Sequence, residues 1–387
     1  MKKLQMVDLK SQYEKIKEEV NASIQEVLET NTYINGPLVH QFQADLEKYL
    51  GVKHVIPCAN GTDALQIAMM GLDLKHGDEV ITADFTFAAT VEVIALLQLT
   101  PVLVDVDMNN MNISLDGIRK AITSKTKAIV PVHLFGRAAN MDAIMEIAKE
   151  HNLYVIEDNA QAIGADYKSK DGSKKKVGTI GHVGATSFFP SKNLGCYGDG
   201  GAIFTNDDAL AHTLRGIVNH GMYERYHHDV VGVNSRLDSM QAGVLKAKLP
   251  RLDEYNKARQ DAARKYNMAF ANNSNIVTPE FDINRDDHVF HQYVMRITNG
   301  KRDALLAHLQ SKDIPCAIYY PIPLHSQKAY SDARYKEEDF PITNQLCKEV
   351  IALPMHTELD EKQIKFITDS VDMLSNWTCA ASTFGHI

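Results

Sequence analysis

Lys192 and Asp158 are residues of the types, and at the spacing in the sequence, that chemistry on amines requires. Lys192 lies in the segment SFFPSKNLGCYGDGG at 187–201, which follows the segment VIEDNAQ at 155–161. A carboxylate at the end of an apolar strand can keep a pyridine nitrogen protonated, and a lysine amine can form a Schiff base with an aldehyde. The Ser- and Gly-rich loop offers hydroxyl and backbone donors to a phosphate. Asp158 and Lys192 therefore predict pyridoxal 5′-phosphate as the cofactor.

A second segment, NGTDAL at 60–65, joins a predicted strand to a predicted helix. Exposed N–H groups and a hydroxyl at a helix N-terminus form a site for an anion. Taken alone, the segment is better explained by Asn60 or Thr62 capping the helix. Gly61 and Thr62 are therefore candidate phosphate ligands, but this assignment depends on the lysine loop also being part of a cofactor site.

Two further segments could contribute contacts to a ligand. DFTFAAT at 84–90 places aromatic residues after a strand, where one ring could stack on a planar cofactor, although either phenylalanine could equally be core. GVNSR at 232–236 contains Asn234 and Arg236, which could face a ligand or belong to a surface turn.

Other functional motifs are incomplete in this sequence. Asp105, Asp107 and Asn109 have the spacing of a calcium loop, but Asn110 stands where that loop requires glycine. The histidines at 227 and 228 are adjacent, a spacing that does not favour metal binding on a helix. No GxxxxGK(S/T) motif and no strand-bound GxGxxG motif is present, which argues against an NTPase or a dinucleotide oxidoreductase. We expect no metal site.

Composition restricts the partners and the compartment. The 387 residues carry a formal net charge of −8, which argues against nucleic acid or an anionic membrane surface as the main partner. The sequence has no apolar run of about 18 residues, so no membrane span is expected. The five cysteines share no CxxC spacing, which favours free thiols in a reducing compartment. We therefore expect a cytoplasmic protein.

The pattern of the first 250 residues predicts an α/β fold. Residues 12 to 30 have apolar positions at three- and four-residue steps, which indicates a helix. Short β-rich runs then alternate with helical stretches, and this alternation predicts a mostly parallel sheet covered by helices on both faces. The predicted strands are His54–Pro57, Glu79–Thr82, Pro101–Val106, Ala128–Val132 and Leu153–Ile156, with further strands around the lysine loop within Gly178–Thr205. The predicted helices are Thr62–Met70, Thr90–Leu97, Ser114–Ala121 and Met141–Glu150.

A different pattern begins near residue 250. A charged helix from Arg251 to about Ala271 precedes a smaller α+β pattern, and the tail after about Ser375 has no periodicity. We therefore predict a large domain at 1–250 and a small C-terminal domain at 251–387. The predicted elements of the small domain are the strand His291–Ile297, the helix Arg302–Lys312 and the strand Cys316–Tyr320.

Taken together, these segments resemble the DegT/DnrJ/EryC1/StrS family of nucleotide-sugar aminotransferases over roughly residues 5 to 375. The resemblance is carried by GTDAL, DNAQ, SFFPSKNLGCYGDGG, GVNSRLDSMQA and YPIPLHSQ. It implies a fold-type I pyridoxal phosphate enzyme that forms a homodimer with active sites shared between the subunits. Neither terminus has room for an added DNA-binding module, so a cofactor-binding regulator of the same fold is a remote alternative.

The resemblance also implies a role for individual residues. Lys192 would form the Schiff base, Asp158 would face the pyridine nitrogen, Gln161 would contact the ring or its hydroxyl, and Phe87 would stack on the ring. Gly61, Thr62 and Ser187 would hold the phosphate, together with Asn234 of the neighbouring subunit. The expected contacts to the sugar nucleotide are Asn31, Tyr33, Ser191, Arg236, Tyr319, Tyr320 and His325.

The substrate is expected from the same resemblance. Members with histidine in place of Lys192 are dehydratases, so the lysine implies transamination. The sequence is most similar to enzymes that aminate C3 of UDP-2-acetamido-2-deoxy-3-oxo-glucuronate for cell-surface polysaccharides such as O-antigen, with glutamate as the expected amino donor. One departure is Tyr319 in Tyr-Tyr-Pro, where the family often has His-Tyr-Pro. The alternative is therefore a C3 or C4 aminotransferase acting on a dTDP- or UDP-linked 6-deoxy keto sugar.

Overall fold

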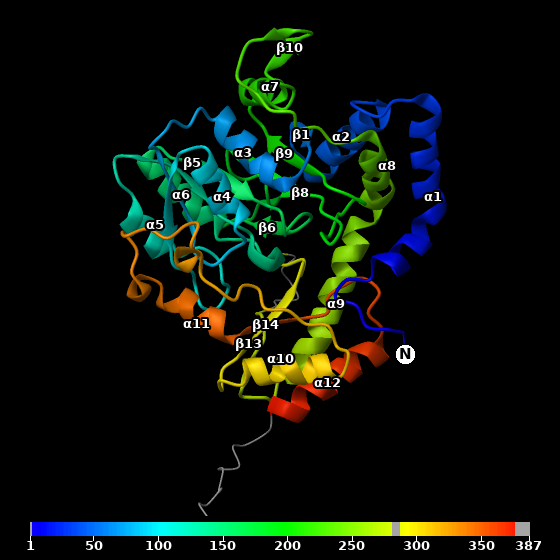
Figure 1. Cartoon of the computed structure of the whole chain (residues 1–387), viewed down its shortest axis with the longest axis vertical. Coiled ribbons are helices and arrows are strands. Elements are labelled where there is room, and N and C mark those ends of the chain that lie inside the picture. Colours follow the sequence, from blue (N-terminus) through cyan, green and yellow to red (C-terminus); the bar gives the residue numbers. More distant parts are fainter. Residues whose placement is uncertain (1, 281–286, 376–387) are drawn as a thin grey trace, which may run out of the picture.

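A computed structural model describes residues 2–280 and 287–375. The main sheet has seven strands in the order β1-β9-β8-β5-β4-β2-β3, in which only β9 runs against the others (Figure 1). This arrangement confirms the predicted α/β fold with a mostly parallel sheet. The strands are β1 (His54–Cys58), β2 (Glu79–Ala83), β3 (Thr100–Val104), β4 (Thr126–Val130), β5 (Tyr154–Asp158), β8 (Val183–Ser187) and β9 (Gly201–Thr205).

Both faces of the sheet are buried, which explains why its strands are apolar on successive residues. Val80 packs into a core cluster on one face and its neighbour Ile81 packs into a cluster on the other. The consecutive β5 residues Val155 and Ile156 likewise pack into clusters on opposite faces of the sheet. One face is covered by α3 (Gly61–Gly71), α4 (Ala89–Leu96) and α7 (Asp208–Ile217), and the other by α5 (Leu115–Ala121), α6 (Met141–His151), α2 (Pro37–Leu50) and α8 (Ser239–Lys248).

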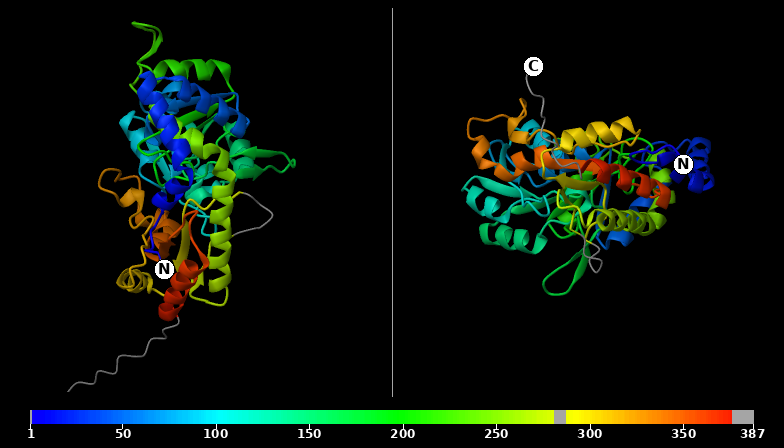
Figure 2. Two further views of the ribbon diagram at one scale, coloured as in Figure 1. Left: turned by 90° about the vertical axis from the view of Figure 1, so that its right-hand side faces the viewer. Right: turned by 90° about the horizontal axis from the view of Figure 1, so that it is seen from below.

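Most predicted elements are present with small shifts at their ends. The first helix is α1 (Leu9–Thr30), which lies beside α8 (Figure 1). The helices α2, α7 and α8 were not predicted from the sequence. The lysine-rich residues 168–176 lie in a hairpin of β6 (Asp166–Lys168) and β7 (Lys174–Lys176), in which Lys174 and Lys176 pair with Asp166. A second hairpin joins β10 (Met222–Glu224) to β11 (His227–His228), and both hairpins project from the body (Figure 2).

The C-terminal part is reached through the long helix α9 (Leu252–Phe270), which runs down one side of the molecule (Figure 1). Its three-stranded sheet has the order β12-β13-β14. The expected strand Cys316–Tyr320 is wrong, because this segment makes only a single bridge between Ala317 and Ala352. The elements are β12 (Ile276–Val277), β13 (Tyr293–Ile297), β14 (Val350–Leu353), α10 (Arg302–Ser311), α11 (Pro341–Glu349) and α12 (Glu361–Ser375).

The division of the chain at residue 250 stays a prediction. Leu4 packs in the core of the C-terminal part, and the Met355 backbone N–H donates to the Met6 carbonyl at 3.2 Å. The first residues of the chain therefore lie on the part that the prediction assigned to residues 251–387. The tail predicted to lack periodicity lies outside the described residues. No helix within the described ranges has both the length and the apolarity for crossing a bilayer.

Candidate active site

A pocket of about 820 Å³ lies where β2, β4, β5 and β8 end. Ligands of open α/β sheets bind at the carboxyl ends of the parallel strands, so this is the position that the fold favours. Ten of the predicted site residues line the pocket, although they come from segments far apart in the sequence. They are Gly61, Thr62, Phe87, Asp158, Gln161, Ser187, Ser191, Lys192, Tyr319 and Tyr320.

Lys192 and Asp158 both face this pocket and influence each other's ionisation. Burial lowers the pKa of Lys192 to about 8, and the charge of Asp158 opposes this shift. Burial raises the pKa of Asp158, against the hydrogen bonds that it accepts and the charge of Lys192. The two carboxylate oxygens accept from Thr90 Oγ1 at 2.8 Å and from the Ala160 backbone N–H at 3.1 Å. Asp158 is therefore held in one orientation, and part of the Lys192 population is a neutral amine near neutral pH.

The N-terminus of α3 forms one wall of the pocket. Asn60 caps the helix, since its side chain accepts from the Asp63 backbone N–H at 2.8 Å. Thr62 is not the cap and lines the pocket instead. Within the described residues, the backbone N–H groups of Gly61 and Thr62 have no hydrogen-bond partner. A Cβ on Gly61 would lie 2.6 Å from the Cβ of Ser187, so glycine allows this helix end to approach the serine.

Another part of the pocket wall is aromatic and is held by Gln161. The Gln161 side chain accepts from the Phe135 backbone N–H at 2.6 Å and donates to the Tyr320 hydroxyl at 3.1 Å. Tyr320 stacks on Phe135 with ring centroids 6.2 Å apart. Phe87 is 58% exposed and lies 6.4 Å from Tyr320 between centroids, whereas Phe85 is buried in the core. Of the two phenylalanines left open by the sequence, Phe87 is thus the one free to stack on a planar ring.

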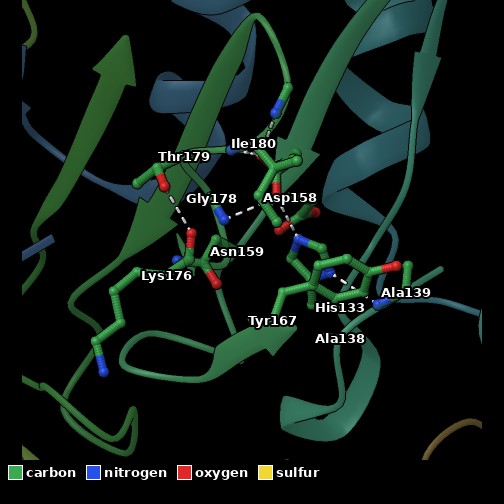
Figure 3. A network of polar contacts seen from close by, with 12 residues as sticks. His133, Ala138, Ala139, Asp158, Asn159, Tyr167, Lys176, Gly178, Thr179 and Ile180 are labelled. Carbon is green, nitrogen blue, oxygen red and sulfur yellow. Dashed lines mark hydrogen bonds and ion pairs between the residues drawn. The ribbon is translucent and has the colours of Figure 1, made fainter. Parts of the chain in front are cut away.

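A buried network lies behind β5 and next to Asp158 (Figure 3). Glu157 accepts from the backbone N–H groups of Gly178, Ile180 and Gly181 at 2.8, 2.6 and 2.6 Å. His133 Nδ1 accepts from the Ala139 backbone N–H at 3.1 Å, which assigns the ring proton to Nε2. That Nε2–H donates to Glu157 at 2.9 Å. The network fixes the turn that follows β7 against the strand that carries Asp158.

Four predicted ligand residues do not line the pocket of their own chain. Asn31 and Tyr33 lie on the loop after α1, and Asn234 and Arg236 lie on the segment before α8. A β-bridge between Ile34 and Asp238 brings these two segments side by side. Within the first segment, the hydroxyl of Tyr33 donates a hydrogen bond to the side chain of Asn31 at 3.2 Å.

His325 also lies outside the residues that line the pocket. Its ring is buried, its Nδ1 lies 2.7 Å from the Asp84 carboxylate, and its backbone N–H donates to the other carboxylate oxygen at 2.7 Å. It stacks on Phe340 with ring centroids 4.4 Å apart. In this chain His325 therefore anchors the segment after Tyr320 to the end of β2.

Sequence reasoning missed several residues of the pocket. Thr86 lines it with a buried hydroxyl that has no partner within the described residues. His291 and Gln292, just before β13, reach the pocket from the C-terminal part, where the sequence indicated only a strand. The one available signal was two polar residues at the start of an apolar strand. Asp63 and Asp199 also line the pocket.

The rejected metal motifs have structural roles. Asp105 accepts from the backbone N–H groups of Ile342 and Thr343 at 2.9 Å each, at the N-terminus of α11. Asp107 accepts from the backbone of Asn109 and Asn110. Across residues 2–280 and 287–375, no group of three His, Cys, Asp or Glu side chains is arranged to hold a metal ion.

The pocket fits pyridoxal phosphate. The slot beside Phe87 and Tyr320 suits a planar ring, and Asp158 and Lys192 offer an acid–base pair to its nitrogen and aldehyde. The unpaired N–H groups at α3 and the hydroxyls of Thr62 and Ser187 suit a phosphate. The unpartnered Thr86 hydroxyl supports a polar ligand as the occupant, because buried polar groups are usually hydrogen-bonded.

Comparison with known proteins agrees with this site. A model of the DegT/DnrJ/EryC1/StrS aminotransferase family matches residues 14–372. The chain is 45% identical to a pleiotropic regulatory protein of Geobacillus stearothermophilus, covering 95% of this chain and 97% of that protein. It is also 45% identical to the UDP-2-acetamido-2-deoxy-3-oxo-D-glucuronate aminotransferase of Pseudomonas aeruginosa, covering 94% of this chain and 98% of that protein.

A solved structure of DesV from S. venezuelae in complex with a ketimine intermediate superposes with a TM-score of 0.92 at 36% identity, covering 98% of this chain and 100% of that one. The match spans both the sheet and the C-terminal part. The chain is therefore a pyridoxal-phosphate-dependent aminotransferase and belongs to the DegT/DnrJ/EryC1/StrS family.

Proposed function

We propose that this enzyme transfers an amino group from glutamate to C3 of UDP-2-acetamido-2-deoxy-3-oxo-glucuronate, a step toward a cell-surface polysaccharide such as O-antigen. The observation that carries the proposal is the lysine pocket in a chain 45% identical, over nearly its whole length, to the P. aeruginosa enzyme named for that substrate. The relative supplies the substrate class, and Lys192 supplies the group that transamination needs.

Bound pyridoxal phosphate supplies an aldehyde and an electron-withdrawing ring. The residues of the chain bind, orient and move protons. Lys192, with its pKa lowered to about 8, can release its proton near neutral pH, accept one from the substrate carbon and return it. A positive ring nitrogen would stabilise the anionic form of Asp158, which burial alone disfavours. Phe87 would stack on the ring, and Gln161 would contact the ring or its hydroxyl.

The substrate's C6 carboxylate would need a cation that the pocket of one chain does not provide. Lys192 is the only lysine or arginine among its lining residues in the described part of the chain. Arg236 lies with Asn31, Tyr33 and Asn234 on the two bridged segments outside the pocket. A homodimer in which these segments enter the neighbouring subunit's site accounts for their separation from their own pocket. In such a dimer Asn234 would reach the partner's phosphate and Arg236 its sugar.

Two substrates test the proposal. The enzyme should convert the UDP-linked 3-oxo-uronate with a higher kcat/KM than a keto sugar nucleotide that carries a C6 methyl group. A charge-assisted contact to the carboxylate is typically worth about 1.5–3 kcal/mol, or roughly ten- to a hundredfold in kcat/KM. A preference for the 6-deoxy sugar would support the alternative aminotransferase instead. Tyr319 is compatible with either, since a phenol can donate to a carboxylate or pack against a methyl group.

A regulatory role is a second candidate, because the Geobacillus relative is named a pleiotropic regulatory protein. A half-reaction separates the two roles. Glutamate added to the cofactor-loaded protein should convert the bound aldehyde form to the amine form and release 2-oxoglutarate in equal amount. A regulator would leave the absorbance of the bound cofactor unchanged.

We also propose a cytoplasmic location. Cys58, Cys196, Cys316 and Cys347 are free thiols, which supports a reducing compartment. Fractionation of lysed cells should therefore recover the protein with the cytoplasmic contents, and recovery from the medium or the membranes would contradict this location.

A further inference from the structure

A second cavity of about 240 Å³ adjoins the lysine pocket. Ser191, His291, Gln292 and Tyr319 line both cavities, so these side chains form the boundary between them. The far side of the second cavity is apolar and consists of Met6, Val7 and Met355. Because the two cavities share this boundary, a ligand bound in the lysine pocket could place a substituent in the second cavity.

Two polar atoms at this boundary have no partner within the described residues. His291 is 5% exposed and its Nδ1 is buried and unpaired. The side-chain oxygen of Gln292 is buried and unpaired as well. Buried polar atoms are usually hydrogen-bonded, so both atoms indicate a ligand that supplies the missing partners.

The walls that carry these atoms are held in place. The buried Arg259 on α9 donates to the carbonyls of Phe290, His291 and Met355 at 3.2, 3.1 and 3.1 Å. The Gln292 backbone N–H donates to the Phe135 carbonyl at 3.3 Å. The cavity is therefore formed before a ligand binds, and a rigid site loses less conformational entropy on binding.

The second cavity is suited to a neutral group. No lysine, arginine, aspartate or glutamate is among its lining residues in the described part of the chain. Burial and the charges of Lys192 and Arg259 lower the pKa of His291 well below its usual value, so this ring is neutral at physiological pH. A carboxylate or phosphate would lose its hydration here without gaining a charged partner.

We propose that the second cavity is the subsite for the acetamido group at C2 of the sugar. The acetamido methyl would pack against Met6, Val7 and Met355, its N–H would donate to the Gln292 oxygen, and its carbonyl would accept from the neutral imidazole of His291. C2 is bonded to the C3 that is aminated, which matches the shared boundary beside Lys192. This inference rests on the proposed function and adds a reason for selecting a 2-acetamido sugar over a 2-hydroxy sugar.

The test is the binding of two unreactive probes, UDP-N-acetylglucosamine and UDP-glucose, to the cofactor-loaded enzyme by isothermal titration calorimetry. The enzyme should bind the acetamido probe about ten- to a hundredfold more tightly, because one buried methyl group and two hydrogen bonds distinguish the probes. Gln292→Met keeps the side-chain volume but removes the acceptor, and should reduce the ratio of the two Kd values several-fold. His291→Phe should do the same. Gln345→Met, an exposed glutamine on α11, is the matched control and should keep the ratio.

The outcomes separate the subsite from the proposed function. A Kd ratio near one in the unmodified enzyme, or a ratio unchanged by both Gln292→Met and His291→Phe, overturns the subsite and leaves the aminotransferase proposal standing. If both probes bind no more tightly than inorganic phosphate, the sugar-nucleotide proposal fails as well. The absorbance of the bound cofactor in each variant shows whether its site is intact.

Discussion

The carboxylates of Glu157 and Asp158 leave β5 on opposite sides although the two residues are consecutive. Glu157 is 0% exposed and accepts three backbone N–H groups and the Nε2–H of His133. Asp158 lines the pocket and accepts from Thr90 and Ala160. Side chains alternate along a strand, so one carboxylate stabilises the fold behind the sheet and the other remains available to a ligand.

Glu157→Gln should destabilise the enzyme by about 2–4 kcal/mol, because an amide replaces one carboxylate oxygen with an N–H that faces backbone donors. Unfolding in urea, followed by circular dichroism, measures the loss. The exposed Glu361→Gln on α12 is the control and should change stability by less than about 0.5 kcal/mol. Equal stability of Glu157→Gln and the unmodified enzyme would mean that the network contributes little.

Lys192→Ala should still bind pyridoxal phosphate but lose turnover by several orders of magnitude. The phosphate and ring contacts remain, while the amine that forms the Schiff base and moves the proton is removed. Equilibrium dialysis measures binding, and release of 2-oxoglutarate measures turnover. Lys175→Ala on the β6–β7 hairpin serves as the control. Turnover by Lys192→Ala at the unmodified rate would refute the lysine's assigned role.

Capture of pyridoxal phosphate by the cofactor-free enzyme should accelerate as the pH rises through about 8, because only the neutral Lys192 amine is nucleophilic. The Asp158 charge raises this pKa, so Asp158→Asn should move the midpoint to lower pH. Stopped-flow absorbance across pH 6 to 10 gives the rate constants for both proteins. An unchanged midpoint in Asp158→Asn would show that the two groups do not interact.

Lys248 offers a second test of a buried amine. Its Nζ donates to the Gly195 carbonyl in the lysine loop at 2.7 Å and lies 4.3 Å from the centroid of the Tyr197 ring. Burial lowers its pKa from 10.5 to about 8. Between these values the unfolded chain binds a proton that the folded chain does not, so the stability contributed by this residue should rise with pH by about 3 kcal/mol.

The measurement for Lys248 is the difference in unfolding free energy between the unmodified enzyme and Lys248→Met at pH 8 and at pH 10. Other lysines contribute equally to both proteins and cancel in the difference. A difference that stays constant over this range would contradict a depressed pKa for Lys248.

Mixing inactive Lys192→Ala with inactive Asn234→Ala should restore part of the activity if two chains share each site. A heterodimer then has one site with both lesions and one with neither, so up to about half of its sites are intact. Activity is measured after subunit exchange, with heterodimers quantified by mass spectrometry. Heterodimers that form without regaining activity would place Asn234 in its own chain's site.

Much of the fold was predictable because local patterns determine it. The apolar runs of β2, β4 and β5 and the helices between them follow from composition along short segments, as buried parallel strands require. The failed strand at Cys316–Tyr320 shows the limit of this reasoning. Its apolar and aromatic residues indicate a strand, but Tyr320 packs against Phe85 and Phe135 and bonds to Gln161, so tertiary contacts outweigh the local preference.

The sequence by itself determined the chemistry of the site, because a lysine loop, an acidic strand end and a glycine at a helix start each have few other uses in combination. Tertiary structure alone decided which residues meet. It buried Phe85 while leaving Phe87 exposed to the pocket, turned His325 toward Asp84, and brought His291 and Gln292 from the C-terminal part into the pocket wall. These choices depend on packing between segments more than a hundred residues apart, whose contacts leave no periodic pattern in either segment.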